Sequence, residues 1–165
     1  MSTSELLASA RSSTVFEQGV PEMTPLPSRT CRLRVFTMRD YEQVIDLWLR
    51  AGITVGPTDS REGILHTLQR NPDLFLIADN GERVVGTVIG TYDGRCGWAN
   101  HVAVDPQWQG VGLGAALMRE LENRLRARGC ARIDLTVARA NAQVQGFYER
   151  LGFDPRDVIV MQKCL

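Results

Sequence analysis

The sequence of 165 residues lacks a Cys-x-x-Cys pair, an apolar run of membrane-spanning length and a surplus of charge of either sign. Its four cysteines are far apart in the chain: Cys31, Cys96, Cys130 and Cys164. Only His66 and His101 could join them as ligands, so we expect no structural zinc site and no other metal. The chain begins without a basic segment followed by an apolar one, so we expect a cytoplasmic protein with reduced thiols.

The charge balance excludes a further class of proteins. Nineteen Lys and Arg residues stand against nineteen Asp and Glu residues, and the pI is near 6.7. Domains that bind nucleic acids through bulk electrostatics are usually strongly basic, so we expect no nucleic-acid partner. No apolar run approaches the roughly 18 residues of a transmembrane helix, so we expect no membrane partner either. With 44% hydrophobic residues, the chain has enough apolar side chains for one globular core.

The first 30 residues differ from the rest of the chain. They hold ten Ser and Thr residues and three of the seven prolines, with little apolar periodicity. Such a segment buries too little apolar surface to offset the entropy lost on ordering, so residues 1–30 are predicted to be a flexible tail. A partner-binding arm, or an arm packed on its own domain, is the alternative. Residues 31–165 are predicted to form one domain.

Hydrophobic periodicity and turn signals predict a regular order of elements after the tail. Strands are expected at 32–36, 74–78, 84–92, 97–104, 133–137 and 158–161, and helices at 41–50, 60–70, 112–128 and 141–151. The Asn80-Gly81 pair predicts a hairpin, and Thr37 with Asp40 resembles a capping box. The order β-α-α-β-β-β-α-β-α-β predicts an α+β fold with a mixed central sheet flanked by helices.

Eight of the fifteen glycines lie between Gly81 and Gly114. We expect those from Gly81 to Gly97 to shape hairpins and strand bends. The group from Gly110 onward opens the long helix, after a strand that ends at Asp105. Glycines let the backbone approach a ligand closely, and amides at the positive end of a helix dipole bind phosphate oxygens. A tight turn without a ligand is the alternative.

Two familiar phosphate motifs fit this turn poorly. A P-loop is excluded because no Gly-Lys-Ser/Thr is present. Gly110-x-Gly112-x-x-Ala115 matches the dinucleotide fingerprint by letter, and Asp134 lies near the position of an acidic ribose ligand. That fingerprint follows its strand directly and opens a run of βαβ units. Here four residues intervene after the strand and a three-strand meander precedes it, so a dinucleotide site is disfavoured.

A third pattern is Gln109-x-x-Gly112-x-Gly114. A second motif lies downstream, where Asn141 is followed by Phe147-Tyr148-Glu149-Arg150-Leu151-Gly152-Phe153. In this order and at this separation, the two motifs resemble those of the GCN5-related N-acetyltransferase (GNAT) superfamily, and the resemblance runs from about residue 32 to the end. The run Gly-Thr-Val-x-Gly-x-Tyr-Asp-Gly at 86–94 also resembles the bacterial YpeA-like branch of that superfamily.

The resemblance implies a GNAT-type sheet and an N-acetyltransferase. Such an enzyme moves an acetyl group from acetyl-CoA, its co-substrate, to an amine by direct attack through a tetrahedral intermediate, without a metal. Backbone groups of the preceding strand would bond the pantetheine arm, and the loop amides would hold the pyrophosphate. The cofactor-binding residues implied in this way are Val102, Ala103, Val104, Gln109, Gly110, Val111, Gly112, Leu113, Gly114, Ala115 and Asn141.

Tyr148 is the predicted catalytic residue. A phenol, with an ordinary pKa near 10, stays protonated at neutral pH and can donate its proton to the departing thiolate. The GNAT superfamily uses a tyrosine at this point of its motif as the general acid. A core aromatic with its hydroxyl at the surface is the alternative. Cys96 and Cys130 are disfavoured as acyl-carrying nucleophiles, because neither is paired in sequence with a histidine.

The general base cannot be identified from the sequence. Thr136 stands where some relatives carry a Glu. Asn100 and His101 lie near the expected thioester, but strand alternation predicts that they point to opposite faces, and a structural histidine is the more usual role for His101. Asp93, Tyr92, a water chain or an amine that arrives neutral are the other candidates.

Like Thr136, Ala115 departs from the pattern of the superfamily, since relatives commonly carry Arg or Lys at this position. CoA affinity would then depend on backbone amides, with Arg119 or Arg139 as compensating cations unless both are solvated surface charges. Thr136 and Ala115 keep one alternative function open, a GNAT-fold module that binds or senses CoA or acyl-CoA without turnover. The acceptor is a small-molecule or peptide amine that the sequence does not identify, and we expect a monomer or homodimer.

Overall fold

The computed structural model describes residues 30–163, so most of the predicted 1–30 tail lies outside the described residues. The strands are β1 (Arg32–Val35), β2 (Phe75–Asp79), β3 (Val84–Tyr92), β4 (Gly97–Val104) and β5 (Ile133–Leu135). The helices are α1 (Tyr41–Arg50), α2 (Arg61–Arg70), α3 (Leu113–Ala127) and α4 (Gln145–Arg150). Short 3₁₀ turns lie at Met38–Asp40, Pro57–Asp59, Pro106–Trp108 and Arg139–Val144.

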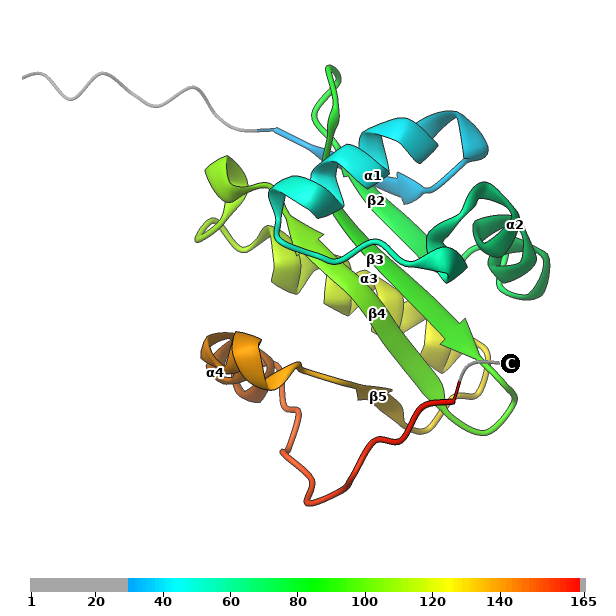
Figure 1. Ribbon diagram of the computed structural model, residues 1–165, viewed down its shortest axis with the longest axis vertical. Coiled ribbons are helices and arrows are strands. Elements are labelled where there is room, and N and C mark those ends of the chain that lie inside the picture. The colour runs from blue at the N-terminus through cyan, green and yellow to red at the C-terminus, as the bar shows by residue number, and fades with distance from the viewer. Residues whose placement is uncertain (1–29, 164–165) are drawn as a thin grey trace, which may run out of the picture.

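The strands form one mixed sheet in the order β1-β2-β3-β4-β5. The first four strands are antiparallel neighbours, whereas β5 runs parallel to β4. Helices α1 and α2 cover one face and α3 covers the other (Figure 1). The predicted α+β fold with a mixed sheet between helices is therefore confirmed.

Three strand glycines make room for α3. The helix places leucines one turn apart over them, Leu117 on Gly86, Leu121 on Gly90 and Leu125 on Gly97. A Cβ on Gly90 would lie 2.2 Å from the Leu121 Cδ1 atom, a distance that no packed pair of carbon atoms adopts. Among the glycines from Gly81 to Gly97 that were predicted to shape hairpins and strand bends, Gly81 and Gly94 lie in hairpin turns, both at φ +91, whereas these three lie within strands. Their role is packing, which a single strand's sequence does not show.

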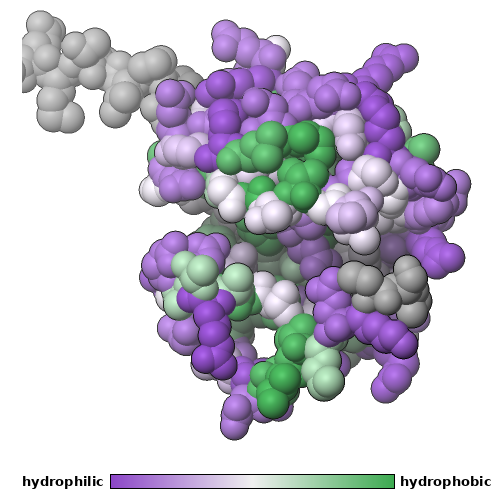
Figure 2. All heavy atoms as spheres, viewed as in Figure 1, coloured by the Kyte–Doolittle hydropathy of each residue, from purple (hydrophilic) through white to green (hydrophobic). Residues whose placement is uncertain are grey.

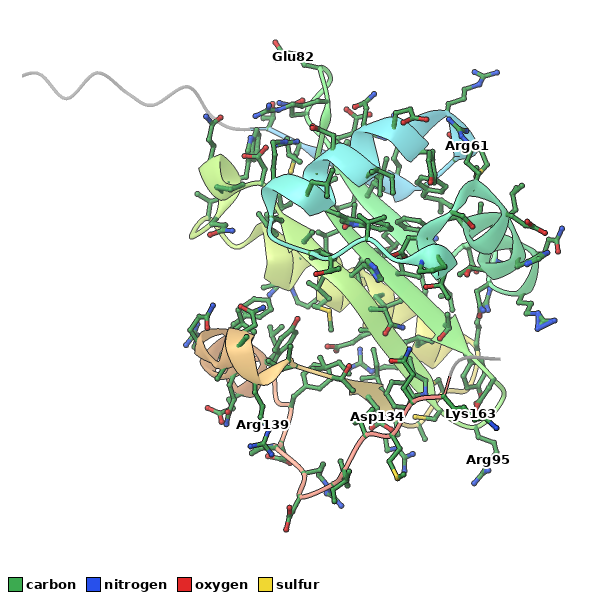
Figure 3. The ribbon with its side chains drawn as sticks, in the orientation of Figure 1. Arg61, Glu82, Arg95, Asp134, Arg139 and Lys163 are labelled. Carbon is green, nitrogen blue, oxygen red and sulfur yellow. The ribbon has the colours of Figure 1, made fainter. Side chains whose placement is uncertain are left out.

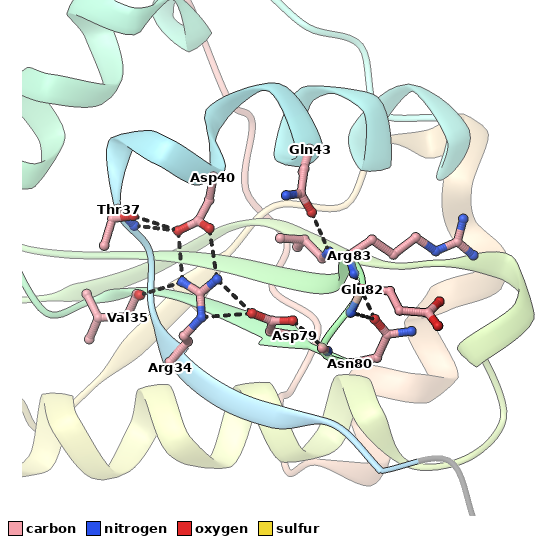
Figure 4. A network of polar contacts seen from close by, with 11 residues as sticks. Arg34, Val35, Thr37, Asp40, Gln43, Asp79, Asn80, Glu82 and Arg83 are labelled. Atoms are coloured by element: carbon pink, nitrogen blue, oxygen red, sulfur yellow. Dashed lines mark hydrogen bonds and ion pairs between the residues drawn. The ribbon is translucent and has the colours of Figure 1, made fainter. Parts of the chain in front are cut away.

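A polar network joins β1, β2 and the start of α1 (Figure 4). Arg34 donates to both carboxyl oxygens of Asp40 at 2.8 Å and to Asp79 at 2.8 Å. The carboxylate of Asp40 also accepts the backbone N–H of Thr37 at 2.9 Å, which confirms the predicted capping contact. The hydrogen-bonded Arg34 guanidinium outweighs burial and holds the pKa of Asp40 below its ordinary value. Beside it, Glu82 projects from the tip of the predicted β2–β3 hairpin (Figure 3).

The C-terminal part of the domain differs most from expectation. The single helix predicted at 141–151 is divided into the 139–144 turn, where Asn141 has a non-helical φ of −114, and the short α4. The strand predicted at 158–161 is wrong: the segment has no regular structure, and Ile159 and Met161 are each 89% exposed. Its β-branched residues favour a strand locally, but a strand also needs a ladder of bonds to a neighbour. The backbone bond of Val158 is local, to Arg156.

Within residues 30–163, no helix combines the length and the apolar character needed to cross a bilayer.

Candidate active site

The two halves of β4 have different neighbours. Gly97–Ala99 pairs with β3 on one side and with β5 on the other. The pairing with β5 ends at Leu135, and the two strands then diverge towards α4 (Figure 1). Among the described residues, no strand pairs with the outer edge of β4 from Asn100 to Val104. Backbone groups that point outward along that edge are therefore not used by a neighbouring strand, although the Val104 carbonyl accepts the Gln109 amide, and Val102, Ala103 and Val104 lie within this stretch.

A β-bulge separates these two halves. Ile89 pairs with Asn100 and Thr87 pairs with Ala103, so two residues of β4 stand opposite the single residue Val88. One of the two is His101, whose φ of +48 is in the left-handed region.

The bulge overturns the prediction that Asn100 and His101 face opposite sides. Ile89, the partner of Asn100, belongs to the core cluster beneath α1 and α2. The His101 ring lies 4.4 Å from the Trp48 ring of α1, so it points to the same face. The extra residue cancels the alternation that a regular strand would impose.

A buried chain of hydrogen bonds fixes the bulge. The Trp48 indole Nε1–H donates to the Thr87 hydroxyl at 2.9 Å, and the Thr87 hydroxyl donates to the His101 carbonyl at 3.0 Å. Trp48 and Thr87 are both fully buried. Since an unmade buried hydrogen bond is costly, this chain favours the one backbone conformation in which all its groups are paired.

The imidazole of His101 meets a carboxylate from a different part of the chain. Its Nε2 atom lies 3.1 Å from Oδ1 of Asp59, which is only 5% exposed. The second oxygen of Asp59 accepts the Gly56 N–H at 2.7 Å. The segment 52–60 that carries Asp59 crosses in front of β3 and β4 (Figure 1). Figure 2 shows the surface hollowed between this region and α4.

The glycine-rich turn is anchored at its start by Asp105. This buried carboxylate accepts the Gln107 N–H at 2.9 Å and forms ion pairs with Arg50 and, at 3.2 Å, with Arg83. Burial alone would raise the pKa of Asp105, but the Gln107 N–H and the two guanidinium groups outweigh it, and the pKa is lowered. The end of β4 and the following turn are therefore held together by charge-assisted bonds.

The turn itself presents backbone to the surface. Gly110 and Gly112 adopt φ values of +76 and +85, and nothing lies within 4 Å of the position that a Cβ would take on either. The side chain of Gln109 folds back and donates to the Val104 carbonyl at 3.1 Å. The N–H groups of the first turn of α3, from Leu113 to Ala115, have no acceptor within the helix and lie at the positive end of its dipole.

Packing between helices brings the second motif to this turn. A Cβ on Gly114 would lie 3.2 Å from the Phe147 ring, so α4 rests directly against the start of α3. Tyr148 is half-buried, with its ring 5.0 Å from Phe147 and 5.9 Å from Phe153. Burial raises the pKa of the Tyr148 phenol, and its hydroxyl makes no hydrogen bond to the described residues. The phenol therefore remains a proton donor at neutral pH.

The remaining predicted residues lie at the surface. Asn141 is exposed in the 139–144 turn, where its Oδ1 accepts the Gln143 amide at 2.6 Å. Val111 is 59% exposed at the tip of the glycine-rich turn. Arg119 is exposed on α3, one turn after Ala115, and Arg139 projects outward beside α4 (Figure 3).

The glycine-rich turn thus follows the unpaired edge of β4 directly, and α4, which carries Tyr148, packs against the start of α3; the site roles of these residues stay predictions. Sequence reasoning missed Asp59 and Thr87, because nothing local marks a turn carboxylate or a strand hydroxyl as a partner of His101. Within residues 30–163, no three His, Cys, Asp or Glu side chains are grouped to hold a metal ion.

A family model described as the acetyltransferase (GNAT) family matches residues 39–153. Ard1 of Thermoplasma volcanium is 26% identical with a TM-score of 0.67, over 75% of this chain and 82% of that chain. PaiA N-acetyltransferase of Thermoplasma acidophilum, solved in complex with coenzyme A, is 22% identical with a TM-score of 0.69, over 79% and 93%. An Escherichia coli N-acetyltransferase of a ribosomal-protein alanine is 23% identical with a TM-score of 0.64, over 76% and 78%.

The fold and the family model define the class of this protein as an acetyltransferase. The chain belongs to the acetyltransferase (GNAT) family, as the two motifs predicted. Its placement in the YpeA-like branch stays a prediction.

Proposed function

We propose that the protein transfers an acetyl group from acetyl-CoA to an amine by direct attack, without an acyl-enzyme. The observation that carries the proposal is the succession of three neighbouring features: a β4 edge without a strand partner, a turn with open space at Gly110 and Gly112, and, on the α4 helix that packs against the start of α3, a tyrosine whose pKa is raised by burial. Each corresponds to one requirement of the reaction, namely thioester alignment, pyrophosphate binding and protonation of the leaving thiolate.

The residues present fit acetyl-CoA. The edge from Val102 to Val104 would bond the pantetheine arm, and the amides from Gly110 to Ala115 would hold the pyrophosphate, with Asn141 as a further contact. The open space at Gly110 and Gly112 lets phosphate oxygens approach the backbone, where a side chain would otherwise stand. Acetyl-CoA supplies an activated acyl carbon and a thiolate leaving group.

Few cationic side chains are available to bind the pyrophosphate at this turn. The side chain of Ala115 carries no charge, and Arg50 and Arg83 already form ion pairs with Asp105. The affinity for the pyrophosphate therefore depends mainly on the amides and the α3 dipole, with exposed Arg119 as the cation available on the same helix.

The reaction takes place in one transfer. The amine lone pair attacks the thioester carbon, and a C–N bond forms as the C–S bond breaks. Tyr148 gives its phenolic proton to the thiolate and regains one from solvent. Because burial raises the pKa of Tyr148, the phenol stays protonated above neutral pH and is ready to donate.

A cysteine intermediate is disfavoured by the surroundings of Cys96. Burial, together with the Asp134 carboxylate 3.0 Å from its sulfur, raises the pKa of this thiol. A thiol held protonated is a poor nucleophile.

The experiment is to incubate the purified chain with acetyl-CoA and a panel of amines, and to follow the release of free CoA thiol. The panel contains a peptide with a free N-terminus, a polyamine, an amino acid and an aminoglycoside. We expect release above the rate of spontaneous hydrolysis with at least one amine. Saturable CoA binding without release for any amine would overturn the transferase and support the binding or sensing module.

A further inference from the structure

We propose that His101 and Asp59 form the general base of the reaction, with His101 taking the proton from the incoming ammonium group and Asp59 orienting the imidazole. This assignment rests on the proposed acetyl transfer and supplies the base that the sequence does not identify.

The backbone of His101 is strained. A left-handed conformation in a residue with a Cβ costs about 1–2 kcal/mol. The Trp48–Thr87 hydrogen-bond chain ends on the His101 carbonyl and holds this conformation in place. If the side chain only filled the core, a regular strand residue would serve without strain, so the bulge points to a function for the group it reorients.

The ring of His101 has the surroundings of a base. Asp59, on the 57–59 turn, is the charged group that faces it, and its carboxylate side chain is only 7% exposed. The other groups packed around the pair are Trp48 of α1, Thr87 of β3 and the Tyr41 hydroxyl, which donates to the Asp59 carbonyl. The imidazole itself remains 22% exposed, so a substrate can reach it.

The pairing decides which nitrogen can accept a proton. In the tautomer that keeps its proton on Nε2, which lies 3.1 Å from Oδ1 of Asp59, the lone pair is on Nδ1, and Nδ1 has no hydrogen bond to the described residues. The arrangement is similar to that of a catalytic triad, in which a histidine takes a proton from the nucleophile and a carboxylate orients the histidine. In such a triad the carboxylate selects the tautomer and stabilises the imidazolium. The Trp48 ring, 4.4 Å from the imidazole, packs against it and helps to fix its orientation.

The position of His101 suits the amine. It is the residue before Val102, the first of the predicted pantetheine contacts. It points to the α1–α2 face, beneath the 52–60 segment, while Tyr148 comes from α4. Acid and base thus come from different elements, so that one can act on the amine and the other on the departing sulfur.

Every proton in the reaction has a donor and an acceptor. The ammonium group gives one proton to Nδ1 of His101, and the resulting amine attacks the thioester carbon. The new N–C bond leaves a second proton on nitrogen, which goes to solvent as the C–S bond breaks, and the thiolate takes the Tyr148 proton. The phenolate then takes one proton from solvent and the imidazolium releases one. Each turnover therefore releases one proton net.

The test is the pH profile of kcat/KM for His101→Asn, with the best amine found in the panel. Asn is chosen because it tolerates the left-handed backbone that this position requires. We expect kcat/KM to fall about 100-fold at pH 7, in line with general-base contributions. The loss should shrink as pH rises towards the pKa of the amine, since a neutral amine needs no base. CoA affinity and melting temperature should stay near those of the wild type.

Two further variants sharpen the test. Asp59→Asn keeps an oxygen for the Gly56 N–H but loses the charge, and it should lower kcat/KM about tenfold with the same dependence on pH. His66→Gln, at the exposed histidine of α2, is the matched control and should change nothing.

The outcomes separate this proposal from the proposed function. An unchanged kcat/KM in His101→Asn, or a loss equal at every pH, would overturn the base while leaving acetyl transfer intact. A wild type that releases no thiol with any amine would overturn both. If His101→Asn melts early, the profile of Asp59→Asn decides in the same way.

Discussion

The two halves of β4 show how one strand serves both core and site. From Gly97 to Ala99 it is paired on both sides and packed beneath Leu125 of α3. From Asn100 to Val104 one edge is free, the register is broken by a bulge and several side chains are partly exposed. A strand with complete pairing contributes stability, whereas a strand whose neighbour diverges offers its backbone groups to a ligand. Substitutions in the first region should therefore affect folding, and those in the second should affect chemistry.

The largest effect is expected next to the doubly paired half of β4, at Gly90 of β3, which pairs with Ala99. Gly90→Val places a side chain where Leu121 of α3 already lies, 2.2 Å from a Cβ. We expect a loss of about 3 kcal/mol or more in the free energy of unfolding, measured with urea. Gly56→Ala is the control, because its Cβ would meet only an ordinary contact at 3.8 Å. Equal midpoints for the two variants would contradict the packing role of the strand glycines.

The next effect lies at the boundary between the halves. Thr87→Val removes the hydroxyl that joins the Trp48 indole to the His101 carbonyl, and it leaves both groups buried without a partner. We expect a loss of about 1–3 kcal/mol in stability, together with a lower kcat because the bulge is no longer held. Calorimetry and the thiol-release assay measure the two parts. Thr91→Val on the same strand should show neither, and a matching loss there would rule out a specific role for Thr87.

A purely chemical effect is expected for Tyr148→Phe. Loss of the phenolic proton donor should lower kcat tenfold or more, equivalent to about 1.4 kcal/mol, with little change in acetyl-CoA binding. Tyr92→Phe serves as the control, since the Tyr92 hydroxyl bonds a turn carbonyl at Gly94. An unchanged rate in Tyr148→Phe would remove this residue from the mechanism.

The two ends of α3 allow a matched comparison of glycines. Gly112 and Gly129 have similar φ values of +85 and +79, and neither has an atom near the position of a Cβ. Replacing either by Ala should cost about 1 kcal/mol of stability, because a Cβ disfavours the left-handed region. Isothermal titration should show weaker CoA binding for Gly112→Ala alone. Equal CoA affinity in both variants would speak against the amide cradle.

The smallest effect concerns the anchor at the end of β4. Because the pKa of Asp105 is lowered in the folded state, its charge stabilises the fold above about pH 4 and this contribution is lost as pH falls through the lowered value. Asp105→Asn should reduce stability by about 0.5–1 kcal/mol at pH 7, since Arg50 and Arg83 are partly exposed. The difference from the wild type should disappear in strongly acidic solution. A constant difference down to pH 2 would mean that the charge does not matter.

Local interactions are what the sequence by itself determined. The apolar stripe of α3, the Asn80-Gly81 hairpin and the glycine-rich turn each depend on residues close in the chain, and all three lie where they were predicted. The two GNAT motifs identified the family for the same reason, since each consists of residues that are close together in the chain.

Only the tertiary structure decided the features that join distant segments. The bulge that turns His101 towards Asp59 depends on the register between β3 and β4 and on the buried hydrogen bonds from Trp48 to Thr87 and from Thr87 to the His101 carbonyl. The strand glycines acquire their role only when α3 is laid over them, and the 158–161 segment stays irregular despite its strand-forming residues. Propensity and periodicity describe what a segment prefers alone, whereas pairing and packing depend on which segments meet.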